Sequence, residues 1–410
     1  MNSRERVLAA LNHRQPDRVP IDFNGTRSSG ISAIAYARLR EKLGLPPKPL
    51  YVYDIIQEIA IVDEDMLSLF GVDTVELGRA FSLDEKDWVD WRLPNGLPCK
   101  IPAWNRPQRE AGRWVLRSQS GRILAQMPDG ALYFDQTYWP FAQGDRPPEA
   151  ENPAEVMGES MWTAITSPPG PLVEGPDGEQ KLAEGARKLR QSTDRAIVAS
   201  FGGNMLELGQ FLYRNDNFFL ILASEPKRAH AFLEKAMNMY LAKLERYLRA
   251  VGPYIDVILF NDDLGMQTGP QISKRMYREL FKPYNQTMWK RAKQLSPVKV
   301  LLHCCGGVRE LLPDLIEDGL DAINPVQISS RGMEAAGLKA DFGKDLTFWG
   351  GGCDTSQILP RGTPEQVREH VKKQVSILNL SGGFVFQQVH NIQADVPAEN
   401  IITMMEAVNG

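Results

Sequence analysis

Short apolar segments recur along this chain, and stretches with helical periodicity separate them. The apolar segments lie at residues 18–23, 72–76, 196–200, 257–260, 298–302, 322–325, 347–350 and 383–386. Strands that alternate with helices are typical of a parallel sheet. Eight such units predict an α/β fold in the form of a closed (β/α)8 TIM barrel, with a doubly wound open sheet as the alternative.

Two segments fall outside this repeating pattern. Residues 6–11 have apolar side chains at helical spacing, and Pro16 stops the pattern, so an N-terminal helix is predicted before the first strand. Residues 81–141 are rich in aromatic side chains and contain Asn-Gly, Ser-Gly and Asp-Gly pairs, which are typical of hairpins. We therefore predict one barrel domain over residues 1–410 that carries an inserted β-meander at 81–141.

The composition limits the class of protein. Hydrophobic residues make up 43% of the chain and charged residues 24%, with a net charge of −4, which predicts a globular protein without a nucleic-acid partner. There is no apolar run long enough for a membrane span and no apolar start typical of a signal peptide, so we expect no membrane partner and a cytoplasmic location. Four cysteines favour a thiolate site in a reducing compartment over a disulfide framework.

A histidine and two cysteines follow the predicted strand 298–302. In a TIM barrel the functional groups lie at the C-terminal ends of the strands, so this position is a candidate site. Side chains alternate along an extended segment, so His303 and Cys305 point the same way and Cys304 points the other way. We interpret His303 and Cys305 as a chelating pair for zinc.

Catalytic zinc commonly has three protein ligands and one open position, so a third ligand is needed. Cys353 follows the seventh predicted strand and His390 follows the eighth. Spacing alone leaves both residues open as the third ligand.

Polar residues after other strands are candidates for catalysis and substrate binding. Asp262 and Asp263 follow the fourth strand, where one carboxylate is expected to act as a general acid or cation binder and the other as a helix cap or partner of an arginine. The residues assigned to substrate binding are Asn24, Arg27, Asn204 and Gln388. The chain lacks the Walker, GxGxxG, HExxH and GxSxG motifs, which disfavours nucleotide-binding, zincin and serine-hydrolase functions.

These motifs resemble those of the uroporphyrinogen decarboxylase superfamily, and within it the cobalamin-dependent methyltransferases that include the methylcobamide:coenzyme M enzymes. The similarity runs from residues 4–20 to residues 397–408. The resemblance implies that His303 and Cys305 bind zinc. It places His390 where the family has its third ligand, a cysteine, and makes Cys353 a local variant that does not bind the metal.

The resemblance implies a zinc-dependent enzyme that moves a methyl group between a small O-, N- or S-methylated substrate, or a thiol or other acceptor, and the cobalamin of a partner corrinoid protein. Two nitrogens and one sulfur would make a stronger Lewis acid than a site with two thiolates. The alternatives are a porphyrinogen decarboxylase, whose Arg-Gln-Ala-Gly-Arg motif is missing from residues 23–30, and a non-catalytic corrinoid- or tetrapyrrole-binding protein. A homodimer formed through the outer helices is also open.

Overall fold

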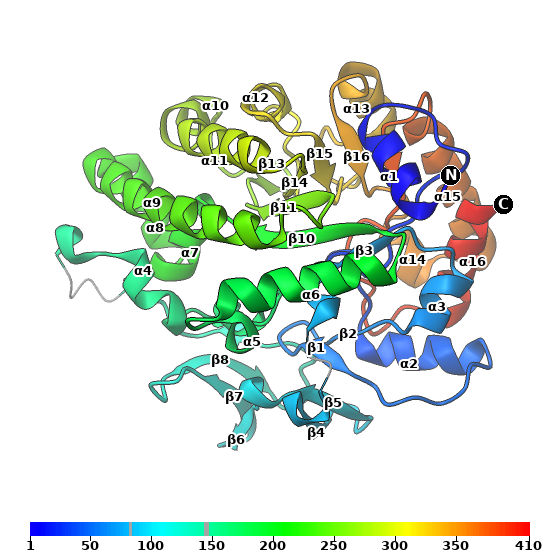
Figure 1. Ribbon diagram of the computed structural model, residues 1–410, viewed down its shortest axis with the longest axis horizontal. Helices are drawn as coiled ribbons and strands as arrows, with labels where there is room; N and C mark the ends of the chain where they lie inside the picture. The colour runs from blue at the N-terminus through cyan, green and yellow to red at the C-terminus, as the bar shows by residue number, and fades with distance from the viewer. Residues whose placement is uncertain (82–83, 143–146) are drawn as a thin grey trace.

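A curled sheet of parallel strands lies at the centre of the molecule (Figure 1). The structure is a computed structural model that describes residues 1–81, 84–142 and 147–410. Within these residues, seven strands pair in parallel in the order β3, β10, β11, β14, β15, β16 and β17. Their bounds are Thr74–Glu76, Ala196–Gly202, Val257–Asn261, Lys299–His303, Ala322–Asn324, Thr347–Trp349 and Phe384–Val385.

The first predicted strand joins the two ends of this sheet. Ile21 forms a parallel bridge with Phe386, whose N–H donates to Pro20 O at 2.8 Å. On the other side, the N–H of Asp73 donates to Ile21 O at 2.8 Å. The predicted TIM-barrel fold is therefore confirmed, with its first strand shortened to a bridge because the chain turns away at Asn24, where φ is 68°.

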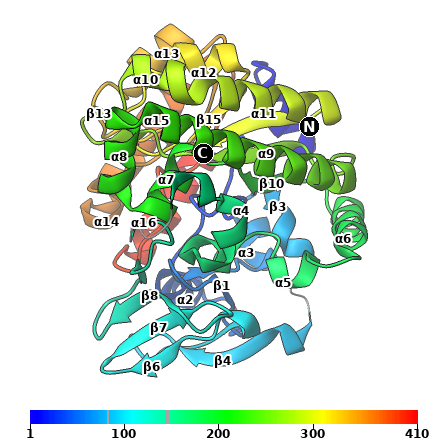
Figure 2. The ribbon, with the colours of Figure 1, turned by 90° about the vertical axis from the view of Figure 1, so that its left-hand side faces the viewer.

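Helices cover the outside of the barrel, as the two views at right angles show (Figures 1 and 2). The longer ones are α2 (Ala33–Lys42), α6 (Gly178–Ser192), α7 (Leu206–Tyr213), α8 (Asn215–Ser224), α9 (Pro226–Val251), α11 (Lys282–Leu295), α13 (Ala335–Phe342), α15 (Pro364–Leu378) and α16 (Ala398–Asn409). The shorter ones are α3 (Glu64–Leu69), α4 (Pro153–Val156), α5 (Gly170–Val173), α10 (Lys274–Met276), α12 (Leu312–Asp318) and α14 (Ile358–Arg361). None of the described helices has the length and apolar character needed to cross a bilayer.

The barrel interior is packed with side chains from alternate strand positions. These buried side chains are Ala196, Val198, Val257, Leu259, Leu301, Ala322, Trp349 and Val385. The predicted N-terminal helix is α1 (Ser3–Leu11), and its Val7, Ala10 and Leu11 complete this cluster. The N–H of Arg4 donates to Asp194 O, just before β10, so α1 closes the barrel at the N-terminal ends of the strands.

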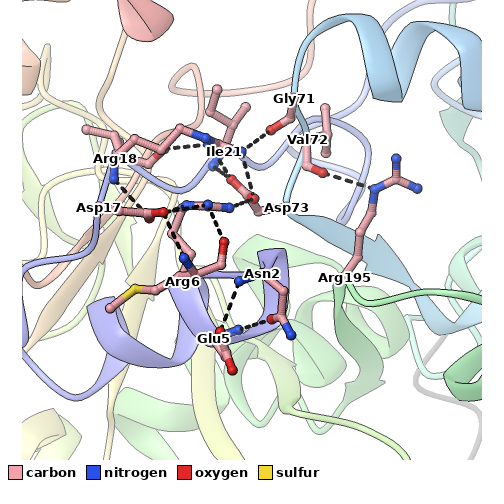
Figure 3. A network of polar contacts seen from close by, with 12 residues as sticks. Asn2, Glu5, Arg6, Asp17, Arg18, Ile21, Gly71, Val72, Asp73 and Arg195 are labelled. Atoms are coloured by element: carbon pink, nitrogen blue, oxygen red, sulfur yellow. Dashed lines mark hydrogen bonds and ion pairs between the residues drawn. The ribbon is translucent and has the colours of Figure 1, made fainter.

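A buried carboxylate fastens α1 to the barrel (Figure 3). Asp73 is fully buried and accepts hydrogen bonds from Arg6 at 2.6 Å, from Arg18 at 2.7 and 2.9 Å, and from the N–H of Ile21 at 2.9 Å. Arg6 also pairs with the more exposed Asp17 at 2.7 Å. This network joins the first helix, the first strand and the start of β3 at one point.

The predicted insertion contains antiparallel strands that lie together at one edge of the molecule, far from α10, α12 and α13, in both views (Figures 1 and 2). These strands are β4 (Trp88–Arg92), β5 (Pro98–Pro102), β6 (Gln108–Glu110), β7 (Arg113–Arg117), β8 (Ile123–Pro128) and β9 (Asp135–Gln136). The first two form a separate hairpin and the other four a meander, because a 3-10 turn at Ala103–Asn105 separates the two sheets. Residues 82–83 of the predicted insertion lie outside the described residues, and its bounds of 81–141 stay a prediction.

Candidate metal centre at the barrel mouth

Two histidines and a cysteine meet at the C-terminal end of the barrel. His303 ends β14, Cys305 lies in the loop after it, and His390 follows β17. Their ligand atoms all lie within 4.8 Å of one another, and Cys305 Sγ is 3.4 Å from His303 Nε2. Of the two candidates for a third ligand, the structure brings His390 to the pair.

Cys353 and Cys304, which also follow predicted strands, do not face the two histidines. Cys353 is fully buried, and its Sγ lies 3.8 Å from Asp354 O. Cys304 is also buried, and its Sγ accepts the N–H of Leu264 at 3.2 Å. Both thiols therefore pack inside the protein, and burial raises the pKa of each.

Close backbone packing fixes the loop that carries Cys305. Gly306 has a φ of 84°, and a Cβ there would lie 2.4 Å from the carbonyl carbon of Gly265. Gly265 belongs to a short hairpin, β12 (Gly265–Met266) and β13 (Gly269–Pro270), which covers the loop. The N–H of Cys305 donates to Asp263 Oδ1 at 2.7 Å, so only glycine at 306 lets the chain turn with the thiol facing His303.

Each of the two histidines at the site forms a hydrogen bond through Nδ1 with an asparagine. Asn324 Oδ1 lies 2.7 Å from His303 Nδ1, and Asn391 Oδ1 lies 2.8 Å from His390 Nδ1. The sequence reasoning missed both asparagines. For Asn324 a signal existed, since a polar residue that ends a buried strand lies at the barrel mouth, but nothing in the sequence paired it with His303.

The two adjacent aspartates have different surroundings. Asp262 is buried and accepts the N–H groups of Met205, Leu206 and Glu207, at 2.9 to 3.2 Å, at the start of α7. Burial raises its pKa to about 7, although these hydrogen bonds act in the opposite direction. Asp263 is 32% exposed, and its Oδ1 lies 3.9 Å from His303 Nε2. Asp263 is therefore the carboxylate that faces the candidate metal centre.

Glu207 is a third carboxyl group close to Asp262 and Asp263. Its pKa is raised to about 8 by burial and by the negative charges of Asp263 and Asp262. Asn204 donates to Glu207 Oε2 at 3.0 Å, so this predicted substrate residue bonds to the carboxyl group. Glu207 was hard to single out from the sequence, because a glutamate in the first turn of a helix is common.

The other predicted substrate residues lie after the first and eighth strands. Asn24 is buried and accepts the N–H of Val62 at 3.1 Å, and Gln388 is buried and donates to Gly30 O at 3.4 Å, so both hold the backbone. Arg27 is 22% exposed and pairs through Nε with Asp54 at 3.1 Å. Its Nε is buried and makes no hydrogen bond to the part of the chain that the structure describes beyond this ion pair.

The donor set fits zinc. Imidazole nitrogen and thiolate sulfur are its usual ligands, and distances of about 2.0–2.3 Å to the metal put tetrahedral ligand atoms about 3.5 Å apart. The three ligand atoms lie within 4.8 Å of one another, which is little more than 1 Å above that value. Burial and the charge of Asp263 raise the pKa of Cys305 to about 11, against the effect of His390, so a metal must displace the thiol proton on binding.

Comparison with known proteins gives a family match and two relatives. The family described as uroporphyrinogen decarboxylase (URO-D) matches residues 163–410, which is more than half of the chain. A methylated-thiol–coenzyme M methyltransferase from Methanosarcina mazei is 27% identical over 184 residues, and this match spans 45% of each chain. A uroporphyrinogen decarboxylase from Psychromonas ingrahamii is 23% identical over 344 residues, which cover 76% of this chain and 92% of the relative.

The fold is also similar to that of a solved methyltransferase from Methanosarcina mazei. The superposition has a TM-score of 0.58 and covers 100% of this chain and 98% of the other, with 15% sequence identity. At this level of identity the similarity concerns the fold alone.

Proposed function

The chain belongs to the uroporphyrinogen decarboxylase (URO-D) family, as the sequence resemblance predicted, and within this family we propose that it is a zinc-dependent methyltransferase. The observation that carries the proposal is the convergence of His303, Cys305 and His390 at the barrel mouth. Decarboxylation of a porphyrinogen needs no metal, so that reaction gives no reason for three nitrogen and sulfur donors to meet. The match to a methylated-thiol–coenzyme M methyltransferase supports the same reaction class.

In this proposal the reaction moves a methyl group between a small methylated substrate, or a thiol or other acceptor, and the cobalamin of a separate corrinoid protein. Bound zinc supplies a Lewis acid for the heteroatom that carries or receives the methyl group. His303, Cys305 and His390 would hold the ion, and three protein ligands leave one position for that heteroatom. Two neutral imidazoles and one thiolate leave more positive charge on the ion than two thiolates and one imidazole.

The chain's own residues bind the substrate and hold its proton. Asp263 Oδ1 is 3.9 Å from His303 Nε2, so this carboxylate is the group that accepts the proton of an incoming thiol or hydroxyl, or returns it to the demethylated product. Arg27, which is 22% exposed, offers its guanidinium group to a polar group of the substrate, and Asn204 donates to Glu207, which lies near Asp263. Asn24 holds the backbone at Val62, and Gln388 holds the backbone at Gly30, close to Arg27 in the chain.

The test of this proposal begins with zinc content. Wild-type protein and the variants His390→Ala, Cys305→Ala and Cys353→Ala are loaded with zinc, dialysed and analysed for metal. We expect about one zinc per chain in wild type and in Cys353→Ala, and loss of zinc in the other two. Wild type without stoichiometric zinc, or variants that keep it, would contradict the ligand set.

Turnover then separates the two family activities. Methylcobalamin is incubated with the zinc-loaded protein and a series of thiols, and cob(I)alamin with O-, N- and S-methylated donors, while the change in corrinoid absorbance is followed. We expect transfer that depends on Cys305 with at least one compound. Metal-independent release of CO2 from uroporphyrinogen by Cys305→Ala would instead establish a decarboxylase.

A further inference from the structure

We propose that Asn324 and Asn391 are positioning residues that hold both histidines in the Nδ1–H tautomer, so that Nε2 of each ring faces Cys305. The effect of these tautomers on zinc binding rests on the proposed function, whereas the tautomers themselves are a property of the metal-free protein. The direction of each hydrogen bond follows from a group at the end of the network that can only accept, a backbone carbonyl for His303 and a carboxylate for His390.

The hydrogen bonds around His303 end on a backbone carbonyl. Asn324 Nδ2 lies 3.0 Å from Trp349 O, which can only accept, so this atom of Asn324 is the NH2 group. The atom that lies 2.7 Å from His303 Nδ1 is therefore the amide oxygen, which can also only accept. The proton of this hydrogen bond must then belong to His303 Nδ1, and in the neutral ring this leaves the lone pair on Nε2.

Asn324 has no freedom to turn over. The residue is fully buried, and its NH2 group also donates to Gln387 Oε1 at 2.7 Å. Its oxygen also accepts the hydroxyl of Ser28 at 2.7 Å. Rotation of the carboxamide by 180° would bring its oxygen against Trp349 O, and because both atoms can only accept, this hydrogen bond would be lost.

The hydrogen bonds around His390 end on a carboxylate. Gln57 donates through Nε2 to Asp54 Oδ2 at 3.0 Å, so its oxygen faces Asn391 and accepts from Asn391 Nδ2 at 3.2 Å. The oxygen of Asn391 is then the atom that lies 2.8 Å from His390 Nδ1, and this nitrogen must carry the proton. Gln393 donates to the same oxygen at 2.6 Å, which supports this orientation.

The two assignments agree with the geometry at the centre of the site. With both Nδ1 atoms protonated, the unprotonated Nε2 of His303 lies 3.4 Å from Cys305 Sγ and accepts the thiol proton. A histidine without a fixed partner at Nδ1 can carry its proton on Nε2, where it blocks metal binding. Loss of the outer hydrogen-bond partner of a metal-binding histidine typically lowers metal affinity 10- to 100-fold.

The two asparagines differ in what holds them. Asn324 ends β15 and is bonded to backbone and buried side chains of neighbouring strands. Asn391 lies in the segment after β17 and depends on the side chain of Gln57. Substitution of Asn324 is therefore expected to weaken zinc binding more than substitution of Asn391.

The first test is histidine NMR on the metal-free protein labelled with 15N-histidine. The chain has five histidines, so His303→Gln and His390→Gln assign the two signals. We expect the Nδ1–H tautomer for both residues in wild type. In Asn324→Leu we expect His303 to show a mixture of tautomers or a rotating ring, while His390 keeps its tautomer. Asn400 is equally buried and donates to Leu359 O and Gly362 O, so Asn400→Leu is the matched control that changes neither histidine.

An Nε2–H signal for either residue in wild type overturns the proposal, and so does an unchanged His303 in folded Asn324→Leu. If Asn324→Leu does not fold, the wild-type tautomers together with Asn391→Leu decide the question.

The second test is zinc affinity by competition with a chelator, with cobalt absorption as the spectroscopic readout of ligand geometry. We expect a 10- to 100-fold loss in Asn324→Leu, a smaller loss in Asn391→Leu and recovery in Asn391→Asp, which restores an acceptor for His390 Nδ1. Equal affinity in wild type and both Leu variants overturns the proposal but leaves the zinc enzyme intact. A wild type that binds no zinc contradicts the proposed function, while the NMR result still decides the tautomers.

Discussion

The two ends of this barrel use buried polar groups in opposite ways. At the N-terminal end, Asp73 is fully buried and is paired by two arginines and a backbone N–H. At the mouth, Asp263 is 32% exposed, and the buried atom Asn261 Oδ1 has no hydrogen-bond partner among the described residues. The comparison teaches that Asp73 at the closed end serves stability, whereas the partly exposed Asp263 at the mouth is accessible to a ligand.

The largest expected effect comes from the closed end. Asp73→Ala removes a buried partner of Arg6 and Arg18, so we expect a loss of about 3–5 kcal/mol in the free energy of unfolding. Urea unfolding followed by tryptophan fluorescence measures it. Asp17→Ala is the control, because Asp17 also pairs with Arg6 but is 44% exposed, and its loss should stay within about 1 kcal/mol. Equal losses in both variants would contradict the comparison.

A pH-dependent effect is expected from Glu58, which is buried with its Oε2 unpaired among the described residues. Burial raises the pKa of Glu58 from 4.5 to about 8, so the unfolded chain releases this proton between pH 5 and 8 while the folded chain keeps it. Wild type should therefore lose roughly 3 kcal/mol more stability over this range than Glu58→Gln, because Glu207 and Asp262, whose pKa values are also raised, contribute equally to both proteins. Urea unfolding at pH 5 and pH 8 measures the difference, with the exposed Glu399→Gln as control. A constant difference between wild type and Glu58→Gln would mean that Glu58 is ionised in the folded protein.

Zinc should add stability at the mouth. A ligand that binds only the folded state at 100 times its dissociation constant stabilises it by about 2.7 kcal/mol. We expect this gain in wild type and its absence in Cys305→Ser, whose metal-free stability should remain close to that of wild type. Thermal unfolding with and without zinc measures the effect. A similar zinc-dependent gain in Cys305→Ser would show that the ion binds elsewhere.

The smallest effect is expected from Ser28→Ala. This change removes one hydrogen bond to Asn324 Oδ1 but leaves that of His303, so the cost should be about 1 kcal/mol with zinc content unchanged. Urea unfolding and metal analysis check the two parts. Loss of zinc in this variant would mean that Ser28 itself keeps Asn324 in place.

The barrel was predictable because buried parallel strands appear in the sequence as apolar runs between helices. The shortening of the first strand to a bridge at Ile21 was not, since it depends on the turn at Asn24. The division of the inserted sheet in two depends on a single 3-10 turn, which the hairpin signals do not reveal.

The pair His303 and Cys305 was predictable from the alternation of side chains along a strand. The choice between Cys353 and His390 was open because it depends on how the chain continues after β16 and β17. Adjacent aspartates look alike in sequence, and only the position of α7 separates the helix cap Asp262 from the exposed Asp263. The partners of the histidines were out of reach, because tertiary contacts decide which side chain meets each Nδ1.

Because the first strand is short, fewer backbone hydrogen bonds hold the barrel together there than between the other strands. Between β17 and β3 the wall is held by the backbone hydrogen bonds of Ile21 and its neighbours, whereas β11 and β14 pair over five residues each. Transient opening should therefore occur first at this wall, and amide hydrogen exchange should be faster at Phe386 than at Leu301. His390 follows β17, but its segment has attachments of its own, because the N–H of Val389 donates to Cys353 O at 2.8 Å and the N–H of Ile392 donates to Gly30 O at 3.0 Å. The three side chains should therefore stay together while the barrel opens at Ile21.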